Sequence, residues 1–185
     1  AVFDMNLQAA QQVAQGIEQS GGLARAYSCD ITQRAQVDAA VAQVEADWGS
    51  IEVLVNNAGW DVFKPFTKTS PDDWSRLIAI NLTGALHMHH AVLPGMVERR
   101  KGRIINIASL AGVKAVPMIS TYCMSKAAVA HMTRAMAVEW GRYGINVNAI
   151  CPSYISTELN EHHWETEAGQ KLIAMTPRKR LGQAD

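Results

Sequence analysis

The sequence lacks any apolar run close to the ~20 residues that a membrane-spanning helix needs, and it lacks an excess of charge of either sign. The 17 lysines and arginines balance 17 aspartates and glutamates. A neutral chain offers no basic surface for nucleic acid or for an anionic membrane. No secretory signal peptide is recognisable. We therefore expect neither nucleic acid nor a membrane among the partners of this chain.

Cysteine is scarce. The three residues Cys29, Cys123 and Cys151 are an odd number and do not have the spacing of metal ligands. All three stand among apolar residues, which predicts buried free thiols in a reducing compartment. On these grounds we expect a cytoplasmic protein.

The rest of the composition is that of an ordinary globular α/β protein. The 185 residues are 48% hydrophobic and 18% charged, and this length suits one domain over residues 1–185. Apolar runs predict strands, and segments with helical periodicity follow them. The expected strands are 1–4, 23–29, 51–55, 103–108 and 145–150, and the expected helices are 7–19, 33–48, 72–97, 120–142 and 157–175.

The alternation of strands and helices predicts right-handed crossovers and a parallel sheet. Because the strands do not alternate between apolar and polar residues, we expect both sheet faces to be buried, in a three-layer α/β/α arrangement. Ligands of such sheets bind at the carboxyl ends of the strands. Polar or unusual residues stand at these ends: Asp4, Asp30, Asn57, Ser109 and Pro152.

The segment Tyr122-Cys-Met-Ser-Lys126 contains the strongest chemical signal. It places a phenol and an ammonium one helical turn apart, on the same helix face. A neighbouring lysine stabilises the phenolate, so we expect the pKa of Tyr122 to be lowered, which favours proton exchange near neutral pH. Ser109, at the end of the preceding strand, could hydrogen-bond the same substrate oxygen. This combination suits carbonyl–alcohol chemistry with a separate hydride carrier.

Taken together, these residues resemble the classical short-chain dehydrogenase/reductase family along the whole chain. The matching pieces, in order, are Asp4, Cys29-Asp30-Ile31, Asn56-Asn57-Ala58-Gly59, Asn81, Ser109, Tyr122 with Lys126, Asn146-Val147-Asn148, Pro152 with Thr157, and Pro177 with Arg180. Each piece is common by itself, whereas their order and spacing are specific. The resemblance implies a Rossmann-like, doubly wound parallel sheet and an NAD(P)-dependent enzyme that interconverts a secondary alcohol and a ketone.

The resemblance also implies roles for individual residues. Tyr122 is expected to be the general acid/base, assisted by Lys126, with Ser109 polarising the substrate carbonyl and Asn81 holding a water that links Lys126 to solvent. Helix or loop capping is the alternative for Ser109 and Asn81. The expected cofactor residues are Asp4, Asp30, Ile31, Asn57, Ala58, Gly59, Tyr122, Lys126, Pro152, Ile155 and Thr157. The expected substrate residues are Trp60, Ser109, Met118 and Tyr154.

Asp4 bears on the choice between NAD and NADP. A carboxylate at this strand end can accept both ribose hydroxyls, and it would repel a 2′-phosphate by ~4 kcal/mol at a partly shielded site. No arginine stands beside it to compensate. We therefore predict NAD over NADP. The alternative is that Asp4 caps the helix that begins near Leu7.

The sequence departs from the family at its start. Family members begin with a strand and a glycine-rich turn that holds the pyrophosphate, and no such turn precedes Asp4. We also expect the last strand and the tail of the family, after Asp185, to be missing. We therefore expect an N- and C-terminally truncated fragment of a domain of roughly 250 residues, with an apolar cleft between two unpaired strand edges. The isolated 185 residues should show little activity.

Further expectations concern function and partners. One alternative activity is that of a 3-oxoacyl-[acyl-carrier-protein] reductase, which would favour NADPH; another is a non-catalytic fragment that serves only as a binding or oligomerisation module. Residues 59–99 resemble in part the hydroxyacyl-CoA dehydrogenases of alicyclic acid breakdown. We therefore expect a small alcohol or ketone as substrate, and CoA-linked compounds are among the candidates. The resemblance implies a homo-oligomer, dimer or tetramer. For His87, His89 and His90 we favour a partly interfacial position over a metal site.

Overall fold

The computed structural model describes residues 1–157 and 160–183. Strands and helices alternate along the chain, as predicted. The strands are β1 (Val2–Asp4), β2 (Ala26–Ser28), β3 (Val53–Asn56), β4 (Gly102–Ile107) and β5 (Ile145–Ile150). The helices are α1 (Leu7–Gln19), α2 (Arg34–Trp48), α3 (Pro71–Ile78), α4 (Gly84–Arg99), α5 (Ser120–Trp140), α6 (Glu161–Glu165) and α7 (Glu167–Met175).

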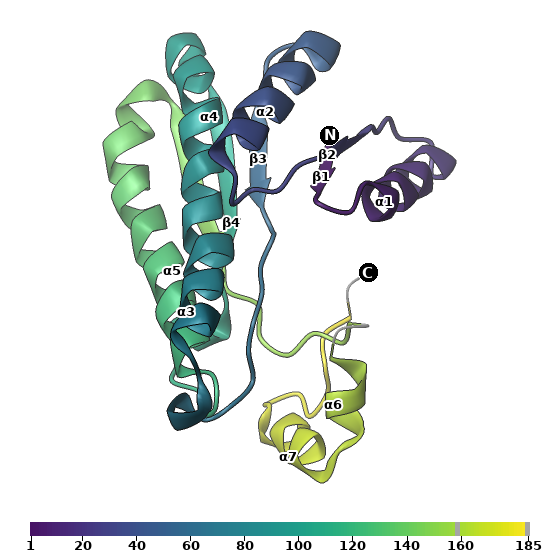
Figure 1. The fold of residues 1–185 in the computed structure, drawn as a ribbon, viewed down its shortest axis with the longest axis vertical. Helices are drawn as coiled ribbons and strands as arrows, with labels where there is room; N and C mark the ends of the chain where they lie inside the picture. The colour runs from purple at the N-terminus through teal and green to yellow at the C-terminus, as the bar shows by residue number, and fades with distance from the viewer. Residues whose placement is uncertain (158–159, 184–185) are drawn as a thin grey trace.

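All strand pairs are parallel, and helices flank the sheets in a Rossmann-like α/β fold, as expected. The strands form two sheets, β1–β2 and β3–β4–β5, and no pairing joins β1 to β3 within the described residues. Figure 1 shows α1 beside the small β1–β2 sheet, apart from the larger sheet. An open cavity of about 590 Å³ lies between β1 and β3, with α2 and α4 contributing to its wall. This cavity is the cleft between two strand edges that the sequence predicts.

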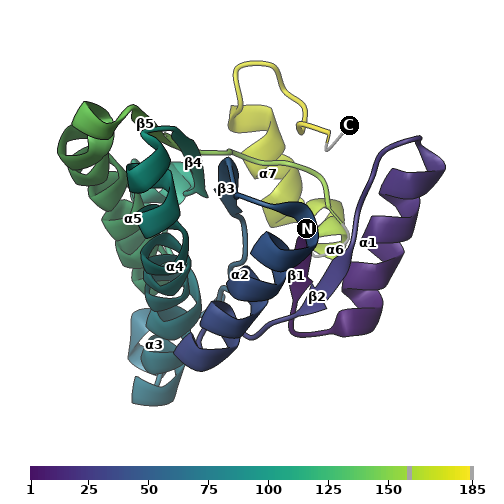
Figure 2. The same cartoon turned by 90° about the horizontal axis from the view of Figure 1, so that it is seen from above.

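The main core lies on one face of the larger sheet. Helices α2, α4 and α5 line up along this face (Figure 2) and bury Val37, Met96 and Ile104 completely. The opposite face is open: Val53 and Val55 on β3 are 47% and 52% exposed. The prediction that both faces are buried is therefore wrong for this sheet, because the second helix layer does not reach β3 in the described chain.

The expected long helix over 72–97 is divided. It begins as predicted, because Ser70 and Asp73 form a reciprocal capping box around Pro71. A π-helical turn, Ala79–Thr83, then separates α3 from α4. Pro94 lies within α4, which continues to Arg99. Turns of the π type are rare, and those that do occur are often found at functional sites.

The remaining predictions concern the second half of the chain. Helix α5 begins at Ser120 as expected and ends at Trp140, and β5 has the predicted bounds. The expected helix over 157–175 is two short helices, α6 and α7, and positions 158–159 of that range lie outside the described residues. Within the described part of the chain, no helix combines the length and apolar character that crossing a membrane requires.

Candidate active site

The three residues with the strongest chemical signal come together at the carboxyl end of β4. Ser109 follows β4, and Tyr122 and Lys126 lie one turn apart on α5. The Lys126 ammonium lies 5.7 Å from the centre of the Tyr122 ring. Gly112 permits this meeting, because a Cβ there would lie 2.6 Å from the backbone carbon of Lys126. The short turn after Ser109 can therefore pack directly on α5.

Ser109 has two roles in this arrangement. Its hydroxyl accepts a hydrogen bond of 3.1 Å from the amide of Ala111, which caps the turn at Leu110–Gly112. It also interacts with the phenol of Tyr122, which favours the ionised form. The capping alternative and the chemical prediction for Ser109 are thus compatible.

The electrostatics of Tyr122 differ from the prediction. Burial of the phenol raises its pKa above the ordinary value; the contact with Ser109 lowers it, and the charge of Asp61 raises it further. The expected lowering by Lys126 is wrong for this structure, because the Lys126 ammonium donates a 2.8 Å hydrogen bond to the Ile107 carbonyl. Burial also lowers the pKa of Lys126. Tyr122 is therefore a protonated phenol near neutral pH, able to donate a proton.

Asn81 lies in the π-helical turn, with only 2% of its surface exposed. Its Oδ1 accepts a hydrogen bond of 2.7 Å from the amide of Trp60, and its Nδ2 donates to the Trp60 carbonyl at 2.9 Å and to Ser125 Oγ at 3.1 Å. Gly59 lies between Asn81 and Lys126, since a Cβ there would be 3.6 Å from Asn81 Oδ1 and 3.5 Å from Lys126 Nζ. The side chain of Asn81 therefore fixes the loop that passes over Lys126.

Four of the expected cofactor residues line the cavity between β1 and β3, at or after the carboxyl ends of β1, β2 and β3. They are Asp4, Ile31, Asn57 and Ala58. Asp4 is exposed and accepts a 2.8 Å hydrogen bond from the amide of Asn6. The cap of α1 is Asn6, whose side chain accepts from the amides of Gln8 and Ala9. The alternative role of Asp4 as the helix cap therefore does not hold.

The other expected cofactor residues lie outside this cavity. Asp30 accepts hydrogen bonds from both the amide and the hydroxyl of Thr32. Pro152 lies beside the catalytic candidates, since its carbonyl accepts from the amide of Leu110 at 2.8 Å. Ile155 and Thr157 are both held by Asn160, which donates to the Ile155 carbonyl and accepts from the Thr157 amide at 2.9 Å each.

The expected substrate residues Trp60, Tyr154 and Met118 each contact a different neighbour. The Trp60 ring lies under the Arg76 guanidinium at 4.5 Å. The Tyr154 ring meets the edge of Trp164 at 5.4 Å. Met118 precedes α5 with a positive φ of 73°, and its carbonyl accepts a hydrogen bond of 3.0 Å from the amide of Lys64.

Asp61 is a site residue that the sequence reasoning missed. Its charge acts on both Tyr122 and Lys126. The signal for this role in the sequence was the position of Asp61, which comes directly after Gly59 and Trp60 in the loop that follows β3.

The three histidines at 87, 89 and 90 contact different partners. His87 bonds the Ile31 carbonyl, His89 contacts Asn56, and His90 contacts Arg34. Within residues 1–157 and 160–183, no three metal-ligating side chains come together.

The cysteines also differ from one another. Cys29 is buried as predicted, whereas Cys123 is half-buried and Cys151 is exposed. The prediction of burial is wrong for Cys151, which follows β5.

A parallel α/β fold with a serine, a tyrosine and a lysine at its strand ends defines a class of oxidoreductase. The family model for short chain dehydrogenases matches residues 1–168. The chain belongs to this family of oxidoreductases. A similar relative is an acetoacetyl-CoA reductase of Shinella zoogloeoides, 42% identical over 159 residues, which are 86% of this chain and 66% of that protein.

Solved structures give the same result. A gluconate 5-dehydrogenase from Burkholderia cenocepacia J2315, in complex with NADP and tartrate, is 37% identical with a TM-score of 0.92. An NAD⁺-bound xylitol dehydrogenase is 34% identical, also with a TM-score of 0.92. Each similarity covers 98% of this chain, and 72% and 76% of the respective solved chains. The relatives include complexes of both dinucleotides, so they do not decide between NAD and NADP.

Proposed function

We propose that the protein interconverts a secondary alcohol and a ketone with a nicotinamide dinucleotide, and that Tyr122 is its general acid/base. The observation that supports this most is the meeting of Ser109, Tyr122 and Lys126 at one strand end, with the Lys126 ammonium 5.7 Å from the tyrosine ring. In the reducing direction, Ser109 hydrogen-bonds the carbonyl oxygen and Tyr122 donates the proton to it. The cofactor, when bound, supplies the hydride that completes the alcohol.

The residues of this chain fit such a cofactor in two places. Asp4 lines the cavity on the side of β1, and Asn57 and Ala58 line it on the side of β3. Carboxylate oxygens there suit ribose hydroxyls. Gly59 lies next to the Lys126 ammonium, so a group seated against this loop would lie within reach of Lys126. In our proposal Lys126 orients that group and Asn81 holds the loop in place.

Three finer points belong to the same proposal. We favour NAD over NADP, because the Asp4 carboxylate is exposed and not used as the helix cap. We favour a small hydroxy compound as substrate, with hydroxyacyl-CoA thioesters as a further class, because relatives are named for gluconate, xylitol and acetoacetyl-CoA. We regard residues 1–185 as one domain, supported by structural similarity over 98% of the chain.

Assembly and compartment are also proposals. Val138 on α5 is 85% exposed, and Leu86 on α4 and Met124 on α5 are 41% and 51% exposed. Exposed apolar residues on neighbouring helices support a homo-oligomer, dimer or tetramer. The three cysteines are free thiols, which supports a reducing compartment such as the cytoplasm.

The Tyr122→Phe substitution tests the function. It removes the proton donor and keeps the ring, so the natural full-length gene product should still bind NADH while its kcat falls by ~10²–10⁴-fold. NADH binding is measured by fluorescence and turnover by absorbance. The matched control is Tyr143→Phe, at the far end of α5, which should leave kcat unchanged. Turnover that persists in the Tyr122→Phe protein would contradict the assigned role.

A further inference from the structure

Asp61 lies beside the proposed reaction site because the preceding residues are fixed there. The side chain of Asn81 holds both backbone groups of Trp60, at 2.7 and 2.9 Å. A Cβ on Gly59 would be 3.5 Å from the Lys126 ammonium. The loop therefore passes directly over Lys126, and Asp61 is the first residue after the clamped pair.

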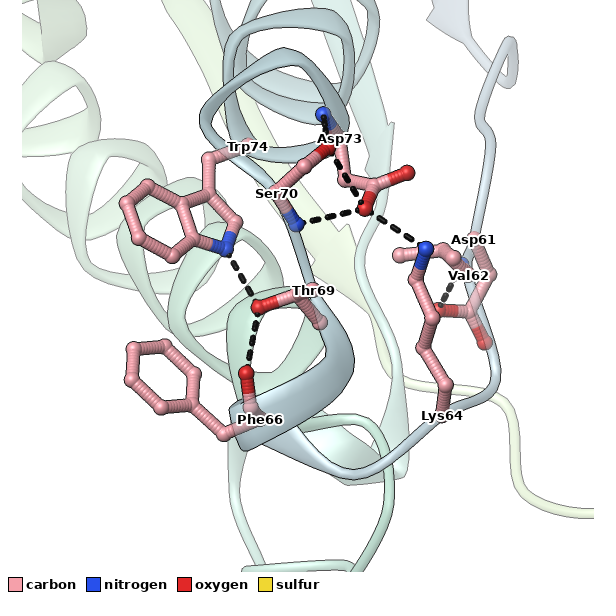
Figure 3. Close-up of polar contacts among 8 residues, drawn as sticks. All are labelled: Asp61, Val62, Lys64, Phe66, Thr69, Ser70, Asp73 and Trp74. Atoms are coloured by element: carbon pink, nitrogen blue, oxygen red, sulfur yellow. Dashed lines mark hydrogen bonds and ion pairs between the residues drawn. The ribbon is translucent and has the colours of Figure 1, made fainter.

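Only one of the two carboxylate oxygens of Asp61 is hydrogen-bonded within the described residues. Its Oδ1 accepts a 2.6 Å hydrogen bond from the amide of Val62, the next residue. The nearby Lys64 ammonium pairs with Asp73 instead, at 2.7 Å. Figure 3 shows this separation: Lys64 is joined to Asp73, and Asp61 is joined to Val62 alone among the residues drawn. Within residues 1–157 and 160–183, Oδ2 of Asp61 has no hydrogen-bond partner, and the residue is exposed.

The charge of Asp61 belongs to the same electrostatic site as Tyr122 and Lys126. It raises the pKa of both groups, while Lys126 in turn lowers the pKa of Asp61. The pKa of Asp61 is raised, mainly because its carboxyl is partly desolvated by the protein, although the residue as a whole is exposed. A carboxylate that bonds only to its own neighbour contributes little to holding the fold together.

An ionised carboxylate oxygen can accept hydrogen bonds and cannot donate them. The donors that a small alcohol offers are its hydroxyls, and the reacting hydroxyl is already bound by Ser109 and Tyr122 in the proposed function. We propose that Asp61 is a specificity residue that accepts a hydrogen bond from a second hydroxyl, next to the reacting carbinol. The preferred substrates are then neutral vicinal diols and polyols, and hydroxy acids that place a carboxylate at this position are disfavoured. This inference rests on the proposed function.

The test compares a diol with a matched mono-alcohol. KM and kcat for 2,3-butanediol and 2-butanol are measured with NAD in the natural full-length gene product, in Asp61→Asn, and in the control Asp72→Asn. Asp72 is an exposed carboxylate in the first turn of α3. A hydrogen bond to a charged group contributes enough to change KM about tenfold. We expect Asp61→Asn to raise the KM of the diol about tenfold and that of 2-butanol less than twofold, and Asp72→Asn to change neither.

An anionic substrate, the hydroxy acid 3-hydroxybutyrate, gives an independent arm. The Asp61→Asn change should lower the KM for this anion severalfold in 20 mM salt, and much less in 0.5 M salt, because salt screens the repulsion. Equal changes in KM for diol and mono-alcohol, or no change for the diol, would overturn the role of Asp61.

Failure of the proposed function has a different signature, which is the absence of turnover for every alcohol in the unsubstituted protein. In that case calorimetric titration of the two alcohols into protein saturated with NADH still decides the inference. Weaker binding of the diol alone in Asp61→Asn would support the contact, and equal binding to both proteins would refute it.

Discussion

The side chain of Asn81 binds both backbone groups of Trp60, accepting from its amide at 2.7 Å and donating to its carbonyl at 2.9 Å. The buried side-chain amide of Asn81 thus makes the two hydrogen bonds that a neighbouring strand would otherwise make with the loop at Trp60. The same Nδ2 reaches Ser125 on α5. The loop after β3, the π-helical turn and α5 are therefore connected through a single residue.

This connection predicts a loss of stability in Asn81→Ala. The substitution leaves the Trp60 amide and carbonyl without partners in a partly buried place, so the free energy of unfolding should fall by about 1–3 kcal/mol. Urea unfolding measures the change. Asn148→Ala, at an exposed position of β5, is the control and should differ little from the unsubstituted protein. A role of Asn81 in proton relay alone would lower turnover and leave the unfolding midpoint unchanged.

Sequence patterns predicted the elements of this fold well, because they depend on local periodicity. Helix α1 and strand β5 have the predicted bounds, and the start of α3 follows from its capping residues. The placement of Tyr122 and Lys126 on one face also follows from helical spacing.

Other features depend on contacts between distant segments, which periodicity does not record. The π-helical turn at Ala79–Thr83 and the separation of the two sheets are of this kind. The raised pKa of Tyr122 is another, because it follows from burial and from the approach of Asp61. Spacing along α5 places Lys126 near the ring but does not show that its ammonium is bonded to the Ile107 carbonyl.

Asp4 should control the choice between NAD and NADP. Removing its charge in Asp4→Ser removes the repulsion of a 2′-phosphate and replaces the charged acceptor for the ribose hydroxyls with a weaker, neutral one. The ratio of kcat/KM for NAD to that for NADP should therefore fall by ~10–100-fold, well within the ~4 kcal/mol of a shielded charge pair. Steady-state kinetics with both cofactors checks this, with Asp72→Ser as the control.

The helix next to Asp4 allows a separate check. Asn6→Ala removes the cap of α1 and should lower the free energy of unfolding by ~1 kcal/mol, whereas Asp4→Ser should change it little. An unchanged NAD preference in Asp4→Ser would show that other residues select the cofactor.

His89 should make stability depend on pH. The residue is 1% exposed, and its Nε2 lies 3.2 Å from Asn56 Nδ2. Burial lowers its pKa in the folded protein, so the unfolded chain binds the proton more readily. The contribution of neutral His89 is complete above the unfolded pKa of about 6.5 and decreases as pH falls below it, by at most ~1.4 kcal/mol per pH unit.

The comparison of the unsubstituted protein with His89→Met separates the pH-dependent contribution of His89 to stability from that of the other histidines. Urea unfolding of both proteins at pH 8.0, 6.5 and 5.5 gives the difference in free energy at each pH. Relative to His89→Met, the unsubstituted protein should lose stability as the pH falls. Parallel curves for the two proteins would show that His89 does not titrate differently on unfolding.

Met118 occupies a backbone conformation that favours glycine. Its φ is 73°, and the hydrogen bond from the Lys64 amide to its carbonyl accompanies this geometry immediately before α5. A residue with a Cβ is disfavoured by roughly 1–2 kcal/mol in the left-handed region, and the greater freedom of glycine in the unfolded chain offsets ~0.5–1 kcal/mol of this. Met118→Gly should therefore be more stable than Met118→Ala by up to about 1 kcal/mol.

Both substitutions remove the side chain, so the difference between them reports the backbone alone. The same pair at Met124, which is 51% exposed within α5, should have the opposite order, because glycine is ~1 kcal/mol less favourable than alanine inside a helix. Thermal and urea unfolding of the four variants measure both differences. If glycine were the less stable replacement at both positions, the backbone at Met118 would not be strained, and its geometry would need no support from Lys64.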